Sequence, residues 1–343
     1  MASRAVTVRP ETTTTLHPFP IGRQTDSVMA ELLSLNNHAH KLYRTAVTDQ
    51  DVLRLAHVQQ DRAEILDFGV NVAGGLAAGL HLAEMCMAGL GKVRLQAAGP
   101  SVDLPQVFVS TDHPLQACLL SQYAGWKIAT DDFFAMGSGP MRATTAGEAL
   151  FEEFSVSEDK TCCVGVLEAG SLPTQSAIDQ MLGQVGDVDQ LSIAVAPTAS
   201  QAGNIQVVAR SVETAMHKLH ELSFPVATII SGTGSAPLPP VAKNDLAGIG
   251  RTNDAILYGS IVNLWVDCDD EQIQHIGAET PSCSSDSHGR LFLELFKEAN
   301  HDFYALDKAL FSPAVVVFHN LRSGNTFQYG KLMPDLLRTS FGM

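Results

Sequence analysis

The sequence of 343 residues predicts a mixed α/β fold, α/β or α+β in type, with two domains. Three observations support this prediction. The chain is longer than most single domains. Its residues are 45% hydrophobic and only 17% charged, which is typical of a well-buried globular protein. From about residue 150 onward, short apolar segments alternate with helical patterns. We expect a first α/β domain at 26–150 and a second at 151–343, with an approximate boundary and segments that can interleave.

The first half of the chain predicts few regular elements. Residues 1–25 are rich in Thr and Pro and lack a hydrophobic period, so we expect a flexible arm. A helix is predicted over 25–45, because a Thr-Asp-Ser cap precedes apolar residues at helical spacing. The stretch 65–90 is predicted to be helical or buried, with a break at the Gly74-Gly75 pair. Short strands are predicted at 92–97 and 106–110.

The second half alternates more regularly. Strands are predicted at 162–167, 191–196, 226–231 and 314–319. Helices are predicted at 174–182, 205–222 and 291–299. The segment 254–266 is predicted to begin as helix or strand and to end as a strand, and a turn is predicted at 320–327. Strands and helices in this order favour an α/β or α+β arrangement.

Composition and charge exclude several classes of partner. Lys and Arg total 22 against 37 acidic residues, and the net charge is −15, so nucleic acid and anionic membranes are poor partners. Aromatic residues make up only 6%, which argues against a stacking platform for single-stranded nucleic acid. No signal peptide or membrane-spanning stretch is visible, so we expect a soluble, cytoplasmic protein. The six scattered cysteines predict buried thiols in a reducing compartment.

Two glycine-rich segments are candidate ligand loops. The segment 137–140 (GSGP) can present successive backbone N–H groups to an anion or to the polar edge of a heteroaromatic ring. Alternatively, it is a tight turn that simply requires glycine. It is not a phosphate-binding P-loop, because the Lys and the following hydroxyl are missing. The segment 231–235 (SGTGS) follows a predicted strand, but the prolines after it exclude a dinucleotide-binding fingerprint.

A charged pair on the predicted helix 205–222 is the candidate acid–base group. Arg210, Glu213 and His217 share one helical face, opposite an apolar face. This spacing is also common for ion pairs on solvated helices. In the functional interpretation, Arg210 keeps Glu213 ionised and oriented so that the carboxylate takes a proton from water. The histidines are dispersed, and neither HExxH nor GxSxG occurs, so metal-free acid–base chemistry is the class of mechanism that remains.

Several separated blocks carry a resemblance to a known family. These blocks are TDHPLQACLLSQYAGW (111–126), FFAMGSGPMRA (133–143), VLEAGSLPT (166–174), APTASQAGNIQVVARSVETAMHKL (196–219), KNDLAGIGRTNDAILYG (243–259) and SGNTFQYGKLMPDLLRTSFG (323–342). On these blocks the chain resembles methenyltetrahydromethanopterin cyclohydrolase over residues 27–342.

The resemblance implies a cytoplasmic enzyme of one-carbon metabolism. It implies reversible addition of water to the cationic methenyl bridge of N5,N10-methenyl-tetrahydromethanopterin, which yields N5-formyl-tetrahydromethanopterin. In an organism that oxidises formaldehyde the hydrolytic direction is expected, and in methanogenesis the reverse. The family implies no metal or redox cofactor, an active-site cleft between two domains, and a homo-oligomer, commonly a homotrimer. The small-molecule pterin is then the expected partner, without nucleic acid or membrane.

The resemblance also implies roles for individual residues. It places the catalytic pair at Glu213, the base, and Arg210, which orients it. Residues expected to line the substrate pocket, or alternatively to have structural roles, are Asp112, Ser121, Gln122, Tyr123, Gly137, Ser138, Gly139, Arg142, Asn253 and Asp254. The SGTGS segment is a further candidate for the pterin edge or an anionic tail.

One block departs from the family pattern, and two alternatives to the implied activity stay open. Ala169-Gly170-Ser171 stand where the family has a basic residue before Leu-Pro. A cyclohydrolase acting on a different tetrahydropterin, such as a tetrahydrofolate derivative, therefore remains an alternative. The second alternative is a non-catalytic pterin-binding carrier.

Overall fold

The computed structural model describes residues 34–343, apart from 124, 146, 155–157, 159–160 and 187. The expected arm at 1–25 and the start of the helix predicted over 25–45 lie outside the described residues. The elements of the first half are α2 (Leu35–Thr48), α3 (Gln50–Leu53), β1 (Ala56–Gln60), β2 (Ala63–Asp67), α4 (Leu76–Cys86), β3 (Gly91–Gln96), β4 (Gln106–Thr111), the π-helix η1 (Leu115–Gln122), β5 (Trp126–Ala129), β6 (Phe134–Ser138), α5 (Met141–Thr145) and α6 (Ala149–Glu153).

The second half continues the mixed α/β pattern that the sequence predicts. Its longer elements are β7 (Cys163–Glu168), α7 (Gln175–Val185), β8 (Leu191–Ala196), α8 (Gln201–Val208), α9 (Ser211–Glu221), β9 (Ile229–Pro237), α10 (Asp245–Gly259), β10 (Ile261–Val266), α11 (Asp270–Ile276), α12 (Phe292–Glu298), β11 (Val315–Asn320), β12 (Thr326–Gly330) and α13 (Pro334–Phe341). Single 3₁₀ turns stand at η2 (Val226–Thr228), η3 (Gly277–Glu279), η4 (Ser282–Ser284), η5 (Phe303–Ala305) and η6 (Lys308–Leu310).

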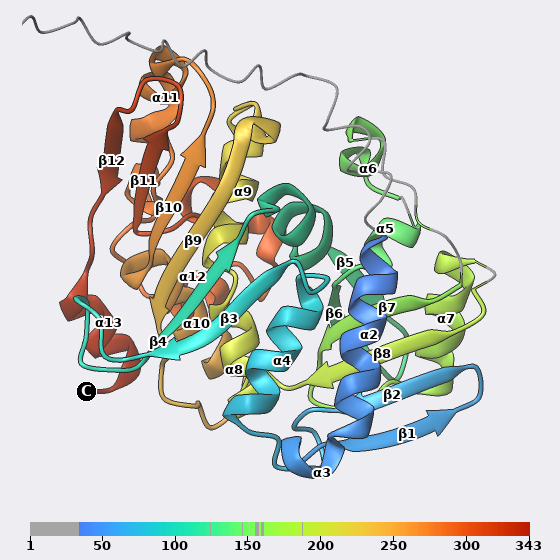
Figure 1. Cartoon of the computed structure of the whole chain (residues 1–343). Helices are drawn as coiled ribbons and strands as arrows, with labels where there is room; N and C mark the ends of the chain where they lie inside the picture. Colours follow the sequence, from blue (N-terminus) through green and yellow to red (C-terminus); the bar gives the residue numbers. More distant parts are fainter. Residues whose placement is uncertain (1–33, 124, 146, 155–157, 159–160, 187) are drawn as a thin grey trace, which may run out of the picture. The chain divides into compact units, whose positions relative to one another are not determined.

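The first sheet has the strand order β1-β2-β8-β7-β6-β5 (Figure 1). Its central strands β2, β8 and β7 are parallel, and antiparallel strands flank them on both sides. The strands β7 and β8 are buried along nearly their whole length, as expected for parallel strands covered on both faces. Leu66 and Ala194 pack with α2 and α4, whereas Ile65 and Ile193 pack with α7 on the opposite face.

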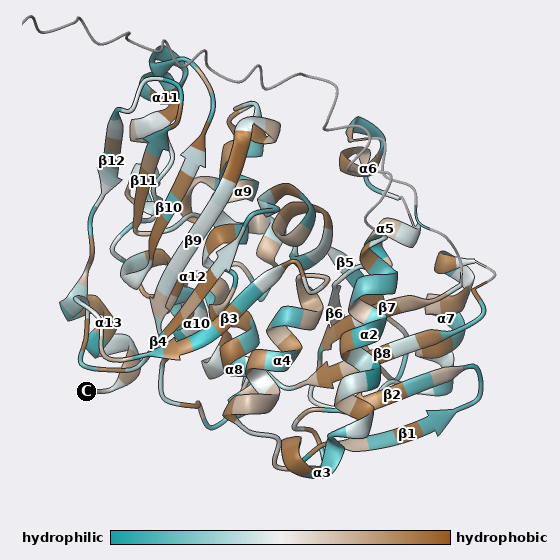
Figure 2. Cartoon of the chain, in the orientation of Figure 1, coloured by the Kyte–Doolittle hydropathy of each residue, from teal (hydrophilic) through white to brown (hydrophobic). Residues whose placement is uncertain are grey.

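The helix α2 shows why one side of a helix faces this sheet. Its buried residues include Leu35, Ala39, Tyr43 and Ala46, which recur at helical spacing. Hydrophilic and hydrophobic colours accordingly alternate along α2 in Figure 2. The apolar stripe of α2 therefore packs inward, together with the buried Asn36, whose side chain accepts a hydrogen bond from the Val164 N–H in β7.

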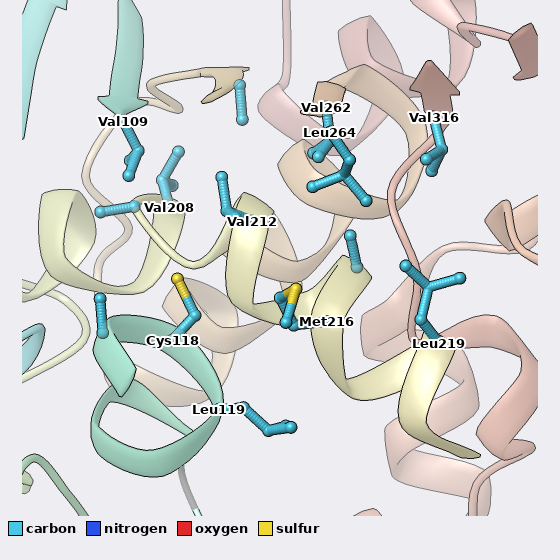
Figure 3. Packing of buried hydrophobic residues seen from close by; sticks show 14 of the residues in the cluster. Val109, Cys118, Leu119, Val208, Val212, Met216, Leu219, Val262, Leu264 and Val316 are labelled. Carbon is cyan, nitrogen blue, oxygen red and sulfur yellow. The ribbon is translucent and has the colours of Figure 1, made fainter. Parts of the chain in front are cut away.

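The second sheet has the order β12-β11-β10-β9-β4-β3, in which only the pair β10 and β11 is parallel. One face of this sheet packs against α9. Figure 3 shows Val212, Met216 and Leu219 of α9 between the strand residues and Cys118 and Leu119 of η1. The strand residues that meet α9 include Val109, Val262 and Leu264.

Most predicted elements are confirmed. The strands predicted at 92–97, 106–110, 162–167, 191–196 and 314–319 are β3, β4, β7, β8 and β11, and the helices at 174–182 and 291–299 are α7 and α12. The break at the Gly74-Gly75 pair is also confirmed: Gly74 has φ +56°, and a Cβ there would lie 2.3 Å from the Phe68 carbonyl oxygen. The stretch predicted to be helical or buried over 65–90 is buried at its start, where 65–67 pair as β2, and its helix begins only at Leu76.

Two further predictions are corrected in the second half. The single helix predicted over 205–222 is two helices, α8 and α9, with a break at Ala209 and Arg210. The strand predicted at 226–231 begins at Ile229 and continues to Pro237, so SGTGS is part of β9 rather than a loop. The prediction for 254–266 is confirmed, because its first part belongs to α10 and it ends as the strand β10.

The glycines of β9 have a packing function. A Cβ at Gly234 would lie 2.2 Å from Ser211 Oγ, and one at Gly232 would lie 3.0 Å from Val212 Cγ1. The first turn of α9 therefore approaches β9 more closely than a side chain would allow. The glycine pattern positions this helix, which carries Glu213.

Both sheets combine strands from either side of residue 150, so the segments interleave. The domain boundary near 150 and the cleft between two domains stay predictions. Among the helices that the structure describes, none has both the length and the apolar character needed to cross a membrane.

Candidate active site

The break between α8 and α9 brings a basic side chain to the start of α9. Arg210 is the N-cap residue of α9, and its carbonyl accepts hydrogen bonds from the backbone N–H and the hydroxyl of Thr214. Gln122 supports the break from η1: its Nε2 donates to the Ala209 carbonyl at 3.2 Å. No glycine or proline stands at Ala209 or Arg210. Contacts with other elements, rather than a helix-breaking residue, therefore support the break between α8 and α9.

Three groups hold the guanidinium of Arg210. Its Nη1 donates to the Gln122 carbonyl, and its Nη2 donates to Ser138 Oγ at 3.1 Å and to Glu168 Oε1 at 3.0 Å. Arg210 is only 5% exposed. Its ion-pair partner is therefore Glu168 at the end of β7, and not Glu213 as the helical spacing predicts.

Glu213 lies in the first turn of α9 and is only 6% exposed. Within the part of the chain that the structure describes, no donor is hydrogen-bonded to its carboxyl group, and no ion pair includes it. Burial raises the pKa of Glu213 to about 7, while Arg210 and Arg142 lower it and Glu168 raises it further. Glu213 can therefore gain or lose a proton near neutral pH, as a general acid–base group must.

A cavity of about 550 Å³ opens in front of this carboxyl group. Its polar wall includes Glu168, Arg210 and Glu213, together with Asp245 at the start of α10. Much of the remaining wall is apolar or aromatic and comes from α10, β6 and the segment 296–311. A volume of this size with a few convergent polar groups is typical of a small-molecule site.

Stacked rings form one side of the cavity. The rings of Tyr123 and His217 lie 4.5 Å apart and nearly parallel. The guanidinium of Arg142 lies 4.8 Å from the centre of the Tyr123 ring, and the fully buried Arg142 is paired with Glu148. Burial lowers the pKa of His217 and raises that of Tyr123 to about 12, so both side chains favour their neutral forms at pH 7. This wall therefore presents a largely uncharged aromatic surface.

The predicted site residues occupy different places. Arg210, Glu213, Tyr123 and Asn253 line the cavity. Gln122 and Ser138 are buried behind it and bind Arg210. Their roles toward substrate, like those of the residues below, stay predictions.

The other predicted wall residues are engaged within the protein. Ser121 is buried, and its hydroxyl donates to the Cys86 carbonyl, while its own carbonyl accepts from the Gly139 N–H. Gly137 lies in β6, and Gly139 has φ +88° in the turn that follows, which agrees with the tight-turn interpretation of GSGP. Asp254 is buried, and its two oxygens accept from the Phe292 N–H and the Ser340 hydroxyl.

Asp112 lies at a different place. It lines a second cavity of about 500 Å³, together with His113 and residues of β4 and β9, and its carboxylate accepts from the Ser231 hydroxyl at 2.7 Å. The SGTGS segment contributes Ser231, Gly232 and Thr233 to this second cavity.

Sequence reasoning missed two features of the main cavity. The first is Glu168, which stands in the block 166–174 but has no predicted role of its own. It lies at the carboxyl end of the parallel strand β7, a place where ligand sites commonly form. The aromatic residues Phe134, which stands in a family block without a predicted role, and Tyr304, which carries no motif, both line the cavity with 58% and 67% of their surface exposed. Within the described ranges, no group of three or more His, Cys, Asp and Glu side chains is arranged to hold a metal ion.

Comparison with known proteins adds the following findings. The family model described as Cyclohydrolase (MCH) matches residues 34–341. A methenyltetrahydromethanopterin cyclohydrolase of Rhodopirellula baltica is 48% identical over 288 residues, which cover 82% of this chain and 86% of the relative. Proteins of the same name from Methylobacillus flagellatus and Methanocorpusculum labreanum are 41% and 39% identical, and the alignments cover 90% and 91% of this chain and 95% and 100% of those relatives.

Proposed function

The chain belongs to the cyclohydrolase (MCH) family, and from this premise we propose that it interconverts N5,N10-methenyl-tetrahydromethanopterin and N5-formyl-tetrahydromethanopterin. The observation that carries the proposal is Glu213. It is a buried carboxyl group without a hydrogen-bond partner among the described residues, it lines a cavity of substrate size, and its pKa is about 7.

In the proposed reaction, the oxygen of water forms a bond to the electrophilic methenyl carbon while Glu213 accepts one proton of that water. The bond from this carbon to N10 then breaks, and N10 takes up a proton. Loss of the hydroxyl proton leaves the neutral formyl group on N5. One proton is released in total, which matches the loss of the positive charge of the substrate.

Each nearby group has a defined task in this scheme. Arg210 lines the cavity beside Glu213, and its charge stabilises the oxygen on which negative charge develops. The aromatic wall of Tyr123 and His217 supports a flat ring system. We further propose that the reaction needs no metal or redox cofactor, because the methenyl carbon of an amidinium cation is already electrophilic.

The experiment that tests the proposal follows the absorbance of the methenyl group. Purified protein is mixed with methenyl-tetrahydromethanopterin and, separately, with methenyl-tetrahydrofolate. Rapid decay of the first compound alone, unchanged by a chelator, is expected. Ala169 and Gly170, which stand where the family has a basic residue, line the cavity. Decay of the tetrahydrofolate compound would therefore show that the loss of this basic residue changes recognition of the substrate tail. Tight binding without accelerated decay of either compound would contradict the proposal and favour a carrier.

A further inference from the structure

Two arginines influence the Glu213 carboxyl group, and each is already paired with another glutamate. Arg210 is paired with Glu168 at 3.0 Å. Arg142 is paired with Glu148 through two hydrogen bonds of 2.7 and 3.1 Å. Both cations beside Glu213 thus have their own anion. When Glu213 is ionised, it is the one carboxylate of these three without a paired cation among the described residues.

Backbone structure fixes the partner of Arg210. Glu168 is the last residue of β7, where it pairs with Met136 of β6 and Ala196 of β8. Its side chain is 19% exposed and lines the cavity. The guanidinium of Arg210 also donates to Ser138 in β6. It therefore cannot move toward Glu213 without giving up bonds to two strands of the first sheet.

We propose that Glu168 is a positioning residue of the proposed reaction: its ion pair holds Arg210 away from Glu213, so that the methenyl cation of the substrate becomes the counter-charge of Glu213. This inference rests on the proposed function. With the Glu168–Arg210 pair neutral, the ionised Glu213 adds one negative charge beside that pair, and the bound cation cancels this charge. The Asp245 carboxylate, which lines the same cavity, is a separate charge that the Glu168 exchange leaves in place. After hydrolysis the product is neutral and Glu213 carries the proton, so the charges balance again.

Other titratable groups near Glu213 also contribute to the electrostatic environment of its carboxyl group. The side chains that face or adjoin it from the neighbouring elements are Cys118 and Tyr123 of η1 and its end, Arg142 of α5, Glu168 of β7, Arg210 before α9, and His217 of α9. Asp245, Glu221 and Lys308 line the same cavity farther along its wall. Of these groups, Glu168 is the carboxylate bonded to Arg210.

Glu168→Gln tests the inference because it removes the charge and keeps the shape. The positive charge of Arg210 is then no longer neutralised by Glu168. It stabilises the ionised form of Glu213 more strongly, and this lowers the pKa of Glu213. We expect the midpoint of kcat/KM against pH for hydrolysis to fall by about one pH unit or more. The KM for the methenyl cation should rise about tenfold, whereas the KM for the neutral formyl compound in the reverse reaction should change less than about twofold.

Two matched variants serve as controls. Glu168→Asp keeps the charge and should restore a midpoint close to that of the unchanged protein, even if Glu168→Gln folds poorly. Glu221→Gln removes one charge from the same cavity, but Glu221 is paired with Lys308 and His217 rather than with Arg210, so the midpoint of this variant should stay in place. Unchanged midpoint and KM values in Glu168→Gln, or the same midpoint shift in Glu221→Gln, would overturn the inference.

A binding measurement separates this inference from the proposed function. Equilibrium binding of the methenyl cation is compared between Glu213→Gln and the double variant Glu168→Gln/Glu213→Gln. This measurement does not depend on turnover. Weaker cation binding by the double variant, about tenfold, supports the role of Glu168. Equal binding overturns it. Absence of turnover by the unchanged protein would contradict the proposed function alone.

Discussion

Pairing of charges, more than their spacing along the chain, decides what each acidic side chain of the site can do. Arg210 and Glu213 are three residues apart, which suggests a simple ion pair. In the structure, the guanidinium is instead bonded to Glu168, and Glu213 remains without a partner among the described residues. An unpaired, buried carboxyl group keeps its proton to a higher pH than a paired one, so Glu213 is suited to exchange protons near pH 7.

Replacement of Glu213 tests its role as a base. Glu213→Gln retains the shape of the side chain and removes its ability to accept a proton. We expect turnover to fall roughly a hundredfold or more, the usual scale for loss of a general base. Initial rates of methenyl absorbance loss measure this, and circular dichroism checks that the variant is folded. Turnover like that of the unchanged protein would remove Glu213 from the mechanism.

The pH dependence of the hydrolysis follows from the same group. Because the pKa of Glu213 is raised to about 7, its ionised form is lost as the pH falls through that value. For hydrolysis, kcat/KM should therefore be high above pH 7 and decrease about tenfold per unit below it. The reverse reaction, which needs the protonated form, should decrease above pH 7. Glu213→Gln should show neither of these two decreases in kcat/KM with pH. A decrease that persists in this variant belongs to another titratable group.

At the scale of elements, the site depends on how closely α9 approaches β9. The strand residues 231–235 resemble a ligand loop in sequence, but Gly234 faces Ser211 at the start of α9. The same first turn of α9 carries Glu213. A side chain added at Gly234 would therefore disturb the start of the helix that carries Glu213.

Gly234→Ala is the corresponding prediction. Its Cβ would lie 2.2 Å from Ser211 Oγ and 3.0 Å from Val212 Cγ2, so the Ser211 hydroxyl must rotate away and the start of α9 must give by a few tenths of an ångström. We expect a loss of about 1–3 kcal/mol in the free energy of unfolding and a decrease in kcat. Gly183→Ala in α7 is the matched control, because nothing lies within 4 Å of its added Cβ. That control should be stabilised by roughly 0.5–1 kcal/mol at unchanged kcat. Urea unfolding and rate assays distinguish the two, and equal effects would contradict the packing argument.

At the scale of the whole molecule, a buried carboxyl group joins three helices of the C-terminal half. Asp254 of α10 accepts hydrogen bonds from Phe292 at the start of α12 and from Ser340 of α13. Burial raises its pKa to about 7 against 3.8 for an exposed aspartate. The folded protein thus binds a proton here that the unfolded chain releases, and this contribution to stability is lost as the pH rises from about 4 through 7.

Asp254→Asn should therefore stabilise the protein at pH 8, because the amide can make both hydrogen bonds without a buried charge. We expect its Tm to exceed that of the unchanged protein at pH 8, with a difference that shrinks toward pH 4. Thermal unfolding at several pH values measures this. A Tm difference that does not vary with pH would contradict the assigned linkage.

The mixed α/β fold, most of the central strands and the family could be predicted from the sequence, because hydrophobic periodicity and motifs are local properties of the chain. The acid–base roles of Arg210 and Glu213 come from the same motifs and stay predictions. Only the tertiary structure decided that 205–222 is broken at Arg210, that SGTGS is a strand, and that Glu168 is the partner of Arg210. Glu168 and Arg210 are 42 residues apart, and sheet register and helix packing bring them together. The same packing sets the pKa of Glu213, since burial and neighbouring charges depend on the assembled fold rather than on sequence spacing.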